Sequence, residues 1–336
     1  MEPLRNCEPS HRRTWQVLCR SDEVTDTPSA YRLMGESWVA WRDEEGRVRV
    51  FADRCPHRRA PLTSGWCEEG RIRCGYHGWL FDSTGRCVEI PALGDGATVP
   101  PRAQLTGPAD VYESHHMVYV ALESPWADPP KVSVDSLSEF QRGDLPVMRA
   151  RASAGLLADN FLDVAHFPFV HRGTFGAQEE RIVPTYHVER MGDGFRAVYE
   201  HDFANREDPG VARGERPLIQ RRRLTYHYVA PYHLELDIEF LDAGGRNVIG
   251  FFLVPEDDEW VRIYSSLWRN DVGGSRERMD EAVAFEIAVI EEDLALQARY
   301  RDFSMPLDLT EEVHTRADRT TVELRRILGE IRQRGF

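Results

Sequence analysis

The sequence predicts an α+β fold with two domains, a small antiparallel β domain followed by a larger domain of antiparallel strands and helices. The chain has 336 residues, whereas a single domain usually has about 100 to 200. Short β-type runs alternate with turn residues over 38–92, and longer β-type segments fill much of 181–268. A long amphipathic helix pattern follows at 277–303. We expect the domains to span residues 1–145 and 146–336.

The first domain is assigned from short runs of residues that favour strands. The runs at 37–41 and 48–51 contain Val, Trp and Phe, and Gly, Pro and Asp turns separate such runs. A further strand is predicted at 117–122, just before a Pro-rich stretch at 124–132. Because Pro-rich segments interrupt regular structure, that stretch is interpreted as the linker region.

The second domain is assigned from a series of strands set between helices. A first helix is expected around 152–166, and a last one from about 319 to 332. Between 277 and 303 apolar residues such as Val283 and Ile287 recur at helical intervals. Strands are expected at 181–203, 221–241, 247–254 and 260–268. Such strands would form a curved antiparallel sheet.

The composition is typical of a globular protein and excludes some classes of partner. Hydrophobic residues make up 41% of the chain and aromatic residues 10%. The net charge of −14 is opposite to what phosphate binding needs, so no nucleic-acid partner is expected. No segment reaches the roughly 18 consecutive apolar residues of a membrane span, and residues 1–24 lack the apolar block of a signal peptide. We therefore expect a cytoplasmic protein without membrane contact.

Two short loops each combine one cysteine with one histidine, as Cys55-x-His57 and Cys74-x-x-His77. In a Rieske centre, two cysteines bind one iron of a two-iron, two-sulfur cluster and two histidines bind the other. Imidazole ligands raise the reduction potential above that of all-cysteine ferredoxins, and such a cluster passes single electrons. The remaining cysteines are interpreted as packing residues or free thiols: Cys7, Cys19, Cys67 and Cys87.

A zinc site built from the same residues is the alternative, because thiolate and imidazole also suit tetrahedral zinc. Zinc fingers usually place two cysteines together and then two histidines, whereas each loop here mixes the two. Residues 54–91 resemble the Rieske domains of bacterial oxygenases. Respiratory Rieske proteins carry an extra cysteine in each loop, and Ala60 and Tyr76 hold those positions here. The resemblance is therefore to the oxygenase or ferredoxin type.

His166 and His171 are candidates for a second metal site. They lie at the end of the first predicted helix, which Pro168 is expected to stop. Two imidazoles five residues apart across such a break can converge on one point. With one carboxylate they would form the 2-His-1-carboxylate facial triad, which leaves positions open on ferrous iron for dioxygen. Two histidines alone are more often satisfied core residues, so their sequence context decides between the two interpretations.

That context is the pattern Asp159-Asn160-x-x-Asp163-x-x-His166-x4-His171. It resembles the iron-binding helix of Rieske non-haem iron oxygenases, in particular the alpha-subunit-only monooxygenase group of vanillate O-demethylase, dicamba monooxygenase and the saxitoxin-pathway Rieske hydroxylases. The resemblance implies a helix-grip (START-like) catalytic domain, in which a curved sheet wraps around a long helix with a pocket between them.

The resemblance also implies a carboxylate ligand on the long C-terminal helix. Asp293 matches the family's acidic position and shares a helix face with apolar residues such as Val289. A buried acid is costly without a partner, and a metal ion would supply that partner. Glu292 also has apolar neighbours and is the competing candidate, while Glu291 is expected to be solvated.

Asp163 and Asn160 are expected to act beside the iron. Asp163 precedes His166 by three residues, so within a helix a carboxylate-to-imidazole hydrogen bond is feasible. In the family that the chain resembles, the matching aspartate links the iron-bearing histidine to a cluster histidine of a neighbouring subunit. The resemblance therefore implies that Asp163 carries electron transfer and that the protein is a homotrimer. Asn160 resembles the family's asparagine beside the iron.

Together these assignments imply the terminal oxygenase component of a multicomponent system. Its cofactors would be a Rieske 2Fe-2S cluster and a mononuclear Fe(II), with O2 as co-substrate. The chain has no Gly-rich dinucleotide fingerprint and no plant-type run of four cysteines, so a separate ferredoxin or flavin reductase would deliver electrons from NAD(P)H. The expected reaction is monohydroxylation or oxidative demethylation of a small organic substrate, in natural-product biosynthesis or aromatic catabolism, with dihydroxylation left open.

Two other functions stay open from the sequence. In the first, the chain is a Rieske electron carrier fused to a ligand-binding domain without oxygenase chemistry, and all of its iron is in the cluster. In the second, the cysteine and histidine quartet holds zinc and the protein is an interaction module. The purified protein would then lack the visible absorption of an iron–sulfur centre.

Overall fold

The computed structural model describes residues 2–94, 96–134, 137–176, 181–206 and 208–335. The outer ends of the two expected domains, residues 1 and 336, lie outside these ranges. The chain forms two compact units. The smaller unit consists of Pro9–Pro129 and Pro255–Asp257, and the larger unit of Met1–Glu8, Pro130–Val254 and Asp258–Phe336.

The smaller unit is built from short antiparallel strands, as the alternation of β-type runs and turns predicts. Its sheets have the strand orders β1-β10-β9, β2-β3-β4 and β5-β6-β7-β8. The strands are β1 (Gln16–Arg20), β2 (Ser29–Leu33), β3 (Glu36–Arg42), β4 (Val48–Ala52), β5 (Trp66–Glu68), β6 (Arg71–Arg73), β7 (Leu80–Phe81), β8 (Cys87–Glu89), β9 (Asp110–Ser114) and β10 (Met117–Ala121). Short 3₁₀ helices connect them at η1 (Pro9–Arg13), η2 (Ser21–Glu23), η3 (Leu62–Ser64) and η4 (Pro91–Leu93).

The core of the smaller unit surrounds Trp41. This side chain is fully buried, stacks on Phe51 with ring centroids 5.6 Å apart, and donates from Nε1 to the carbonyl oxygen of Gly70 at 2.9 Å. An indole that is buried with its N–H satisfied contributes a large apolar area without a polar penalty. Cys55 and Cys74 belong to the same buried cluster, so the two cysteine loops are anchored to the core of this unit.

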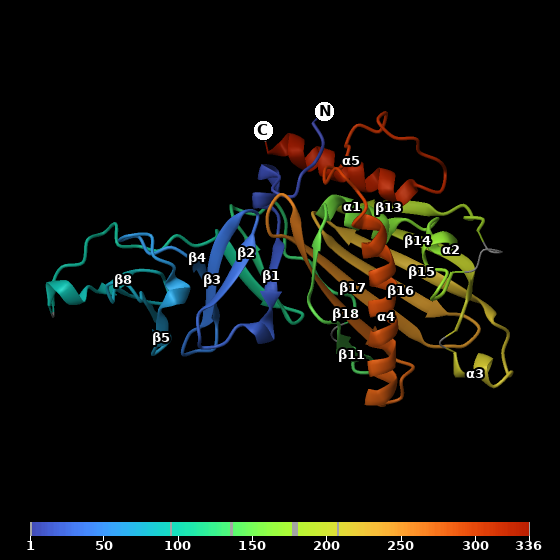
Figure 1. Cartoon of the computed structure of the whole chain (residues 1–336), viewed down its shortest axis with the longest axis horizontal. Helices are drawn as coiled ribbons and strands as arrows, with labels where there is room; N and C mark the ends of the chain where they lie inside the picture. The colour runs from blue at the N-terminus through green and yellow to red at the C-terminus, as the bar shows by residue number, and fades with distance from the viewer. Residues whose placement is uncertain (1, 95, 135–136, 177–180, 207, 336) are drawn as a thin grey trace. The chain divides into compact units, whose positions relative to one another are not determined.

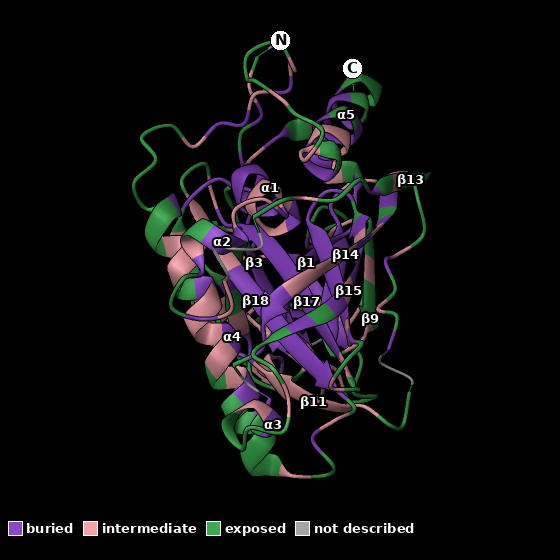
Figure 2. Cartoon of the chain, turned by 90° about the vertical axis from the view of Figure 1, so that its right-hand side faces the viewer, coloured by how far each residue is buried: buried purple, intermediate pink, exposed green. Residues whose placement is uncertain are grey.

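The larger unit is dominated by one long sheet. Its strand order is β11-β18-β17-β16-β15-β14-β13, with β12 also pairing with β18. Neighbouring strands from β13 to β17 are antiparallel. The strands are β11 (Gln141–Asp144), β12 (Met148–Arg151), β13 (His187–Met191), β14 (Gly194–Ala204), β15 (Ile219–Val229), β16 (His233–Phe240), β17 (Arg246–Pro255) and β18 (Trp260–Arg269). Figure 2 shows that β17 and β18 are almost entirely buried.

The larger unit also contains helices. They are α1 (Ala154–Leu162), α2 (Phe167–Val170), α3 (Pro209–Ala212), α4 (Arg276–Gln297) and α5 (Arg319–Arg334). The long helix α4 lies across the sheet (Figure 1). Gly143 on β11 permits this approach, because a Cβ atom there would lie 2.7 Å from Val283 Cγ2 and 2.9 Å from Met279 Sδ. Among the described residues, no helix combines the length and apolar composition needed to cross a lipid bilayer.

The α+β class is confirmed, and the structure corrects several element boundaries. The first helix was expected to reach His166 but ends at Leu162, because the side chain of Asp163 accepts a hydrogen bond from the backbone N–H of Ala165 at 2.7 Å and so competes with helix formation. Pro168 does not stop that helix. It lies in the first turn of the separate helix α2, where a missing N–H costs nothing.

Two helix ends and one strand segment also differ from the sequence prediction. The long helix was expected to reach residue 303 but ends at Gln297, and the last helix extends to Arg334. The segment 221–241 forms two strands that meet at a turn containing Pro231. The expected domain boundary at 145/146 falls inside the larger unit, because β11 pairs with β18 of the same sheet.

Candidate metal centres

The first cysteine loop is closed by two backbone hydrogen bonds. The N–H of Cys55 donates to the carbonyl oxygen of Ala60, and the N–H of Arg59 donates to that of Cys55, each at 2.9 Å. Arg59 has φ +60°, an unusual value for a side chain other than glycine. The loop therefore turns back tightly between the cysteine and residue 60.

The second cysteine loop repeats this geometry. The N–H of Cys74 donates to the carbonyl oxygen of Trp79 at 2.9 Å, and the N–H of Gly78 donates to that of Cys74 at 3.0 Å. Gly78 has φ +71°, and a Cβ atom there would lie 3.2 Å from Pro91 Cγ. Glycine is favoured at this position by both its conformation and its close contact.

The four predicted cluster ligands lie together at the tips of these loops. Cys55 and Cys74 are buried, His77 is exposed and His57 is half-buried. The rings of His57 and His77 have centroids 4.5 Å apart, and His57 stacks on Trp79 at 4.5 Å with an interplanar angle of 6°. The structure thus gathers two thiols and two imidazoles at one place.

The chemistry of this donor set fits a Rieske cluster. Burial raises the pKa of the Cys55 thiol to about 11, and neighbouring Cys74 adds to the rise. A bound metal is what makes a thiolate favourable in such surroundings. Burial lowers the pKa of His57, and its Nδ1 atom is buried without a hydrogen-bond partner in the described part of the chain. A neutral imidazole with an unused nitrogen is the form that binds metals.

Arg73 stabilises the second cysteine loop, a role that nothing in the sequence predicted. Its Nη1 donates to the carbonyl oxygen of Gly78 at 2.6 Å, and its Nη2 donates to Glu68 at 2.5 Å and to Glu89 at 2.9 Å. These carboxylates raise the pKa of the Arg73 guanidinium far above its ordinary value. No motif marks this residue, because its contacts come from three separate strands or turns.

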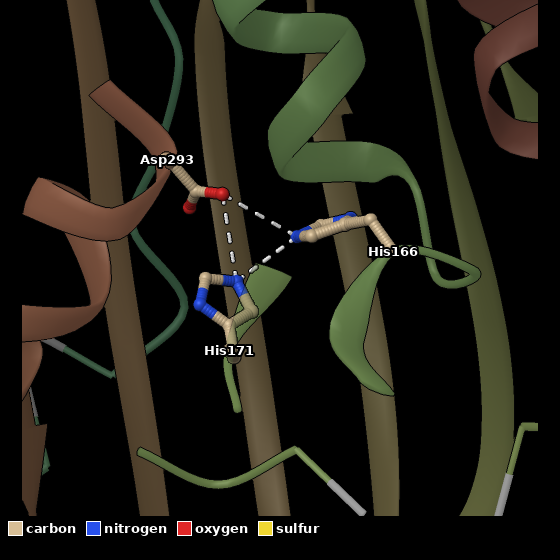
Figure 3. A group of neighbouring side chains, drawn as sticks. All are labelled: His166, His171 and Asp293. Atoms are coloured by element: carbon tan, nitrogen blue, oxygen red, sulfur yellow. Dashed lines mark hydrogen bonds and ion pairs between the residues drawn. The ribbon is translucent and has the colours of Figure 1, made fainter. Parts of the chain in front are cut away.

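The second centre is formed by His166, His171 and Asp293, whose ligand atoms converge (Figure 3). The two Nε2 atoms are 3.0 Å apart, and each lies 3.5 Å from Asp293 Oδ1. The three possible ligand atoms all lie within 4.8 Å of one another. This is the residue set of the facial triad that ferrous iron uses in oxygenases.

The short helix α2 and the long helix α4 bring these residues together. His166 immediately precedes the helix Phe167–Val170 and His171 immediately follows it, so one helical turn separates the two rings. Asp293 lies near the C-terminal end of α4, far away in sequence. The convergence therefore depends on α4 crossing the sheet beside α2.

The two polar residues predicted to act beside the iron also contact the triad. Asn160 Nδ2 donates to Asp293 Oδ1 at 3.2 Å. Asp163 Oδ2 lies 3.5 Å from His166 Nδ1, although Asp163 follows α1 instead of lying inside a continuous helix. Asp163 therefore lies close to His166, although it belongs to the loop that follows α1.

Glu292, the competing ligand candidate, occupies a different place. Its Oε2 atom accepts hydrogen bonds from His171 Nδ1 and from Thr174 Oγ1, both at 2.9 Å. It therefore contacts the side of the His171 ring that faces away from the triad. Nothing in the sequence around Glu292 predicted its contact with His171. Glu291 is exposed, as expected.

The charges of the second centre fit a divalent cation. Burial raises the pKa of Asp293, against the opposing influence of His171 and His166. Burial also lowers the pKa of His171 and so favours the neutral imidazole that a metal needs. A largely buried carboxylate beside the neutral imidazole of His171 is compensated well by a metal cation and poorly by that imidazole alone.

A cavity with an empty volume of about 970 Å³, including space open to solvent, adjoins this centre. It lies between α4 and the sheet, and His166, His171 and Asp293 are part of its wall. Most other lining residues are apolar or aromatic: Leu157, Phe161, Phe167, Phe175, Phe203, Ala204, Leu224, Tyr226, Leu236, Ile238, Phe240, Ile249, Phe251, Phe285, Val289, Ile290 and Leu294. An apolar cavity with few polar groups beside a reactive centre is typical of a small-molecule site.

Comparisons with known proteins agree with both centres. Residues 150–334 match the vanillate O-demethylase oxygenase C-terminal domain, and residues 14–101 match the Rieske [2Fe-2S] domain. The methylxanthine N3-demethylase NdmB of Pseudomonas putida is 28% identical over 97% of this chain and 91% of its own length. The chloroplastic chlorophyllide a oxygenase of Oryza sativa subsp. japonica is 35% identical over 52% of this chain, which spans only 31% of that longer protein.

Solved structures share the whole fold. The structure of Pseudomonas putida CBB5 NdmA with caffeine has a TM-score of 0.84 at 22% identity and covers 98% of this chain and 93% of that one. Dicamba monooxygenase bound to 3,6-dichlorosalicylic acid has a TM-score of 0.81 at 18% identity, over 96% of this chain and 97% of that one. At such identities the likeness concerns the fold alone.

The chain belongs to the vanillate O-demethylase oxygenase family of Rieske non-haem iron oxygenases. It is therefore an oxidoreductase whose cofactors are a Rieske 2Fe-2S cluster and a mononuclear non-haem iron. The zinc interpretation of the cysteine and histidine quartet is thereby set aside.

Proposed function

We propose that this chain is a terminal oxygenase that monohydroxylates or oxidatively demethylates a small organic substrate. The convergence of His166, His171 and Asp293 at the wall of an apolar cavity carries this proposal. In the proposed reaction one atom of dioxygen enters the substrate and the other leaves as water. When the substrate carbon is a methyl group on nitrogen or oxygen, the hydroxylated product loses formaldehyde.

Each predicted ligand is assigned to one centre. Cys55, Cys74, His57 and His77 would hold the cluster, and His166, His171 and Asp293 would hold the iron. When bound, the cluster supplies single electrons and the iron activates dioxygen. Burial favours the neutral imidazole of His171, and the triad borders the cavity in which the substrate would bind.

Electrons are proposed to come from a separate ferredoxin or flavin reductase. Relatives include iron–sulfur subunits of the toluene-4-sulfonate monooxygenase system of Comamonas testosteroni and an oxygenase subunit of its 3-chlorobenzoate-3,4-dioxygenase. Their names describe oxygenase parts of multicomponent systems. The demethylases NdmA and NdmB support demethylation as one possible outcome for this chain as well.

We further propose a homotrimer in which the cluster of one copy serves the iron of the next through Asp163. A hollow beside Asp163 is lined by acidic residues: Asp159, Asp163, Glu312 and Asp318. Arg325 pairs with Asp159 there, which leaves the net charge of the hollow negative. Arginines are exposed around the first cluster loop: Arg54, Arg58 and Arg59. Opposite charges on the two surfaces favour their association between copies.

The function is tested with two variants of the reconstituted protein. His171→Ala should keep the visible absorption and spin-resonance signal of the cluster but lose the mononuclear iron, whereas Cys74→Ser should lose the cluster. Single turnover with isotopically labelled dioxygen and candidate substrates should place label in the product of wild type only. An iron content equal in wild type and His171→Ala would instead support the electron carrier fused to a ligand-binding domain.

A further inference from the structure

A buried polar pair lies in the wall of the cavity, away from the triad. Asn247 on β17 is 1% exposed and Glu286 on α4 is 8% exposed, and both line the same cavity as His166 and Asp293. Polar side chains this deeply buried are costly unless they are hydrogen-bonded. The wall around the pair is mostly apolar, including Ile249 on the same strand, and the other polar lining residues besides the triad are Asn160, Asn205, Arg206 and Arg222.

Asn247 lines the cavity, and one of its side-chain acceptors is left without a partner within the described residues. Its Nδ2 atom lies 3.5 Å from Glu286 Oε1, a long hydrogen bond that fixes which end of the amide faces the carboxylate. The Oδ1 atom is buried and has no hydrogen-bond partner within the described residues. A buried carbonyl oxygen of this kind is satisfied when a ligand brings a donor to it.

The position of Glu286 on α4 indicates how far this pair lies from the triad. Glu286 precedes Asp293 by seven residues, which is about two helical turns and about 10 Å along the axis on the same helix face. A molecule of the size of a substituted aromatic ring can reach both places. The apolar side chains between them would contact its middle.

We propose that Asn247 and Glu286 form the subsite that selects the substrate, by accepting a hydrogen bond from a hydroxyl, amide or amine group at its end remote from the oxidised carbon. This inference rests on the proposed function, because that function places the oxidised carbon at the triad. The substrate class is therefore a small, mainly apolar ring compound with a hydrogen-bond donor at one end.

The same pair disfavours a substrate carboxylate at that end. A carboxylate there would face Asn247 Oδ1 and the carboxylate of Glu286, so acceptors and like charges would meet at that end of the cavity. Arg222, which lines the same cavity, lies on β15 and is separated from β17 by β16. A neutral or cationic donor meets no such repulsion. Discrimination between amide and carboxylate thus follows from Glu286, and discrimination between amide and methyl from Asn247.

The test uses three ring compounds that differ at one position: 4-methoxybenzamide, 4-methoxytoluene and 4-methoxybenzoate. Their dissociation constants are measured by calorimetry without dioxygen, on the complete protein loaded with cluster and ferrous iron. Because no turnover occurs, binding is measured independently of the oxygenase reaction. Wild type should bind the amide more tightly than the benzoate.

Two variants and a matched control assign the selectivity to individual residues. Asn247→Leu should reduce the preference for the amide over the toluene compound by about tenfold, the effect of one hydrogen bond. Glu286→Gln should improve binding of the benzoate relative to the amide by a similar factor of about ten. The control is Ile249→Val, two residues from Asn247 in the same cavity wall, which should weaken binding of all three compounds equally.

The outcomes separate this inference from the proposed function. Equal binding of the three compounds to wild type, or undetectable binding of all three at millimolar concentration, would overturn the subsite. So would an unchanged amide-to-toluene ratio in Asn247→Leu together with an unchanged benzoate ratio in Glu286→Gln. If the ratios shift as stated but labelled dioxygen enters no product, the subsite stands and the oxygenase reaction fails.

Discussion

The Nδ1 atom of His171 lies 2.9 Å from Oε2 of Glu292, on the side of the ring opposite the triad. A carboxylate only accepts hydrogen bonds, so the proton of the imidazole lies on Nδ1 and the lone pair on Nε2. This lone pair points to the place where His166 and Asp293 converge. Glu292 is thus a positioning residue that selects the metal-binding tautomer of His171.

Glu292→Gln should weaken binding of the mononuclear iron by about tenfold, because partners behind a metal ligand typically contribute 10- to 100-fold in affinity. The measurement is iron retention against a chelator, with the visible absorption of the cluster as an internal reference. Glu291→Gln changes an exposed carboxylate one residue away and should leave retention unchanged. Equal retention in all three proteins would show that Glu292 does not orient His171.

Asp163→Asn should keep both metal centres and lower turnover by about 10- to 100-fold. The substitution preserves the shape of the side chain and its acceptor for the N–H of Ala165, but it removes the charge that lies 3.5 Å from His166 Nδ1. Stopped-flow absorption should show slow reoxidation of the reduced cluster by dioxygen in the presence of substrate. The control is Glu311→Gln, an exposed carboxylate in the segment before α5. Near-normal reoxidation in Asp163→Asn would refute the electron-transfer role.

Complementation between two inactive variants tests the proposed homotrimer. Cys74→Ser lacks a cluster and His171→Ala lacks the iron, so neither should turn over alone. If a cluster serves the iron of the neighbouring copy, oligomers assembled from equal amounts of the two variants should recover about a quarter of wild-type activity. In such oligomers, roughly one intersubunit pair in four combines an intact cluster with an intact iron site. Differently tagged chains allow the mixed oligomer to be isolated. Mixed oligomers without activity would indicate transfer within a single chain.

The candidate ligands lie in local sequence patterns, whereas the segments that position them do not. The cysteine and histidine spacing and the pair His166 and His171 are local patterns, and the structure brings each set together. The break of the helix at Asp163 was missed because an aspartate can either continue a helix or bond the nearby backbone and end it. Periodicity alone does not distinguish these two outcomes.

The roles of Glu292 and Asn247 could not be predicted for a different reason. Adjacent acids on a helix point about 100° apart, and only the position of the His171 loop decides which of them meets the imidazole. Asn247 lies in a continuous run of strand residues, where nothing distinguishes it from a chance polar residue. Its role depends on α4 crossing the sheet, which brings Glu286 to its side.

Arg73→Met should make the cluster more labile without preventing its assembly. The guanidinium holds the carbonyl oxygen of Gly78 at 2.6 Å, and this glycine closes the loop that carries Cys74 and His77. Loss of one charge-assisted hydrogen bond should speed the decay of the cluster absorption in air by roughly fivefold to tenfold. The control is Arg71→Met, which removes another arginine of the same strand. Arg71 pairs with the exposed Glu69, so its loss should have little effect on the decay rate of the cluster. Identical decay rates in both variants would show that Arg73 does not stabilise the loop.

Asp208 makes the stability of the larger unit depend on pH in a defined range. Its carboxylate pairs with Arg216 at 2.5 Å and also accepts from Gln220 Nε2 and the N–H of Gly210, both at 2.8 Å. These contacts, the Arg216 hydrogen bond first among them, hold the pKa of Asp208 well below its usual range. Since the folded protein favours the charged form, the resulting stability is present above the unfolded pKa of about 3.9 and is lost as the pH falls further.

Asp208→Asn should therefore lower the free energy of unfolding of the larger unit at pH 7 by about 1 kcal/mol, a modest value because Arg216 remains partly exposed. The difference from wild type should shrink as the pH falls below about 4, where the wild-type carboxyl begins to take up a proton as the chain unfolds. Urea unfolding followed at several pH values measures this. Glu215→Gln, which changes an exposed neighbouring pair with Arg213, should have little effect at any pH. A difference between Asp208→Asn and wild type that is the same at pH 3 and pH 7 would mean that the Asp208 charge does not contribute.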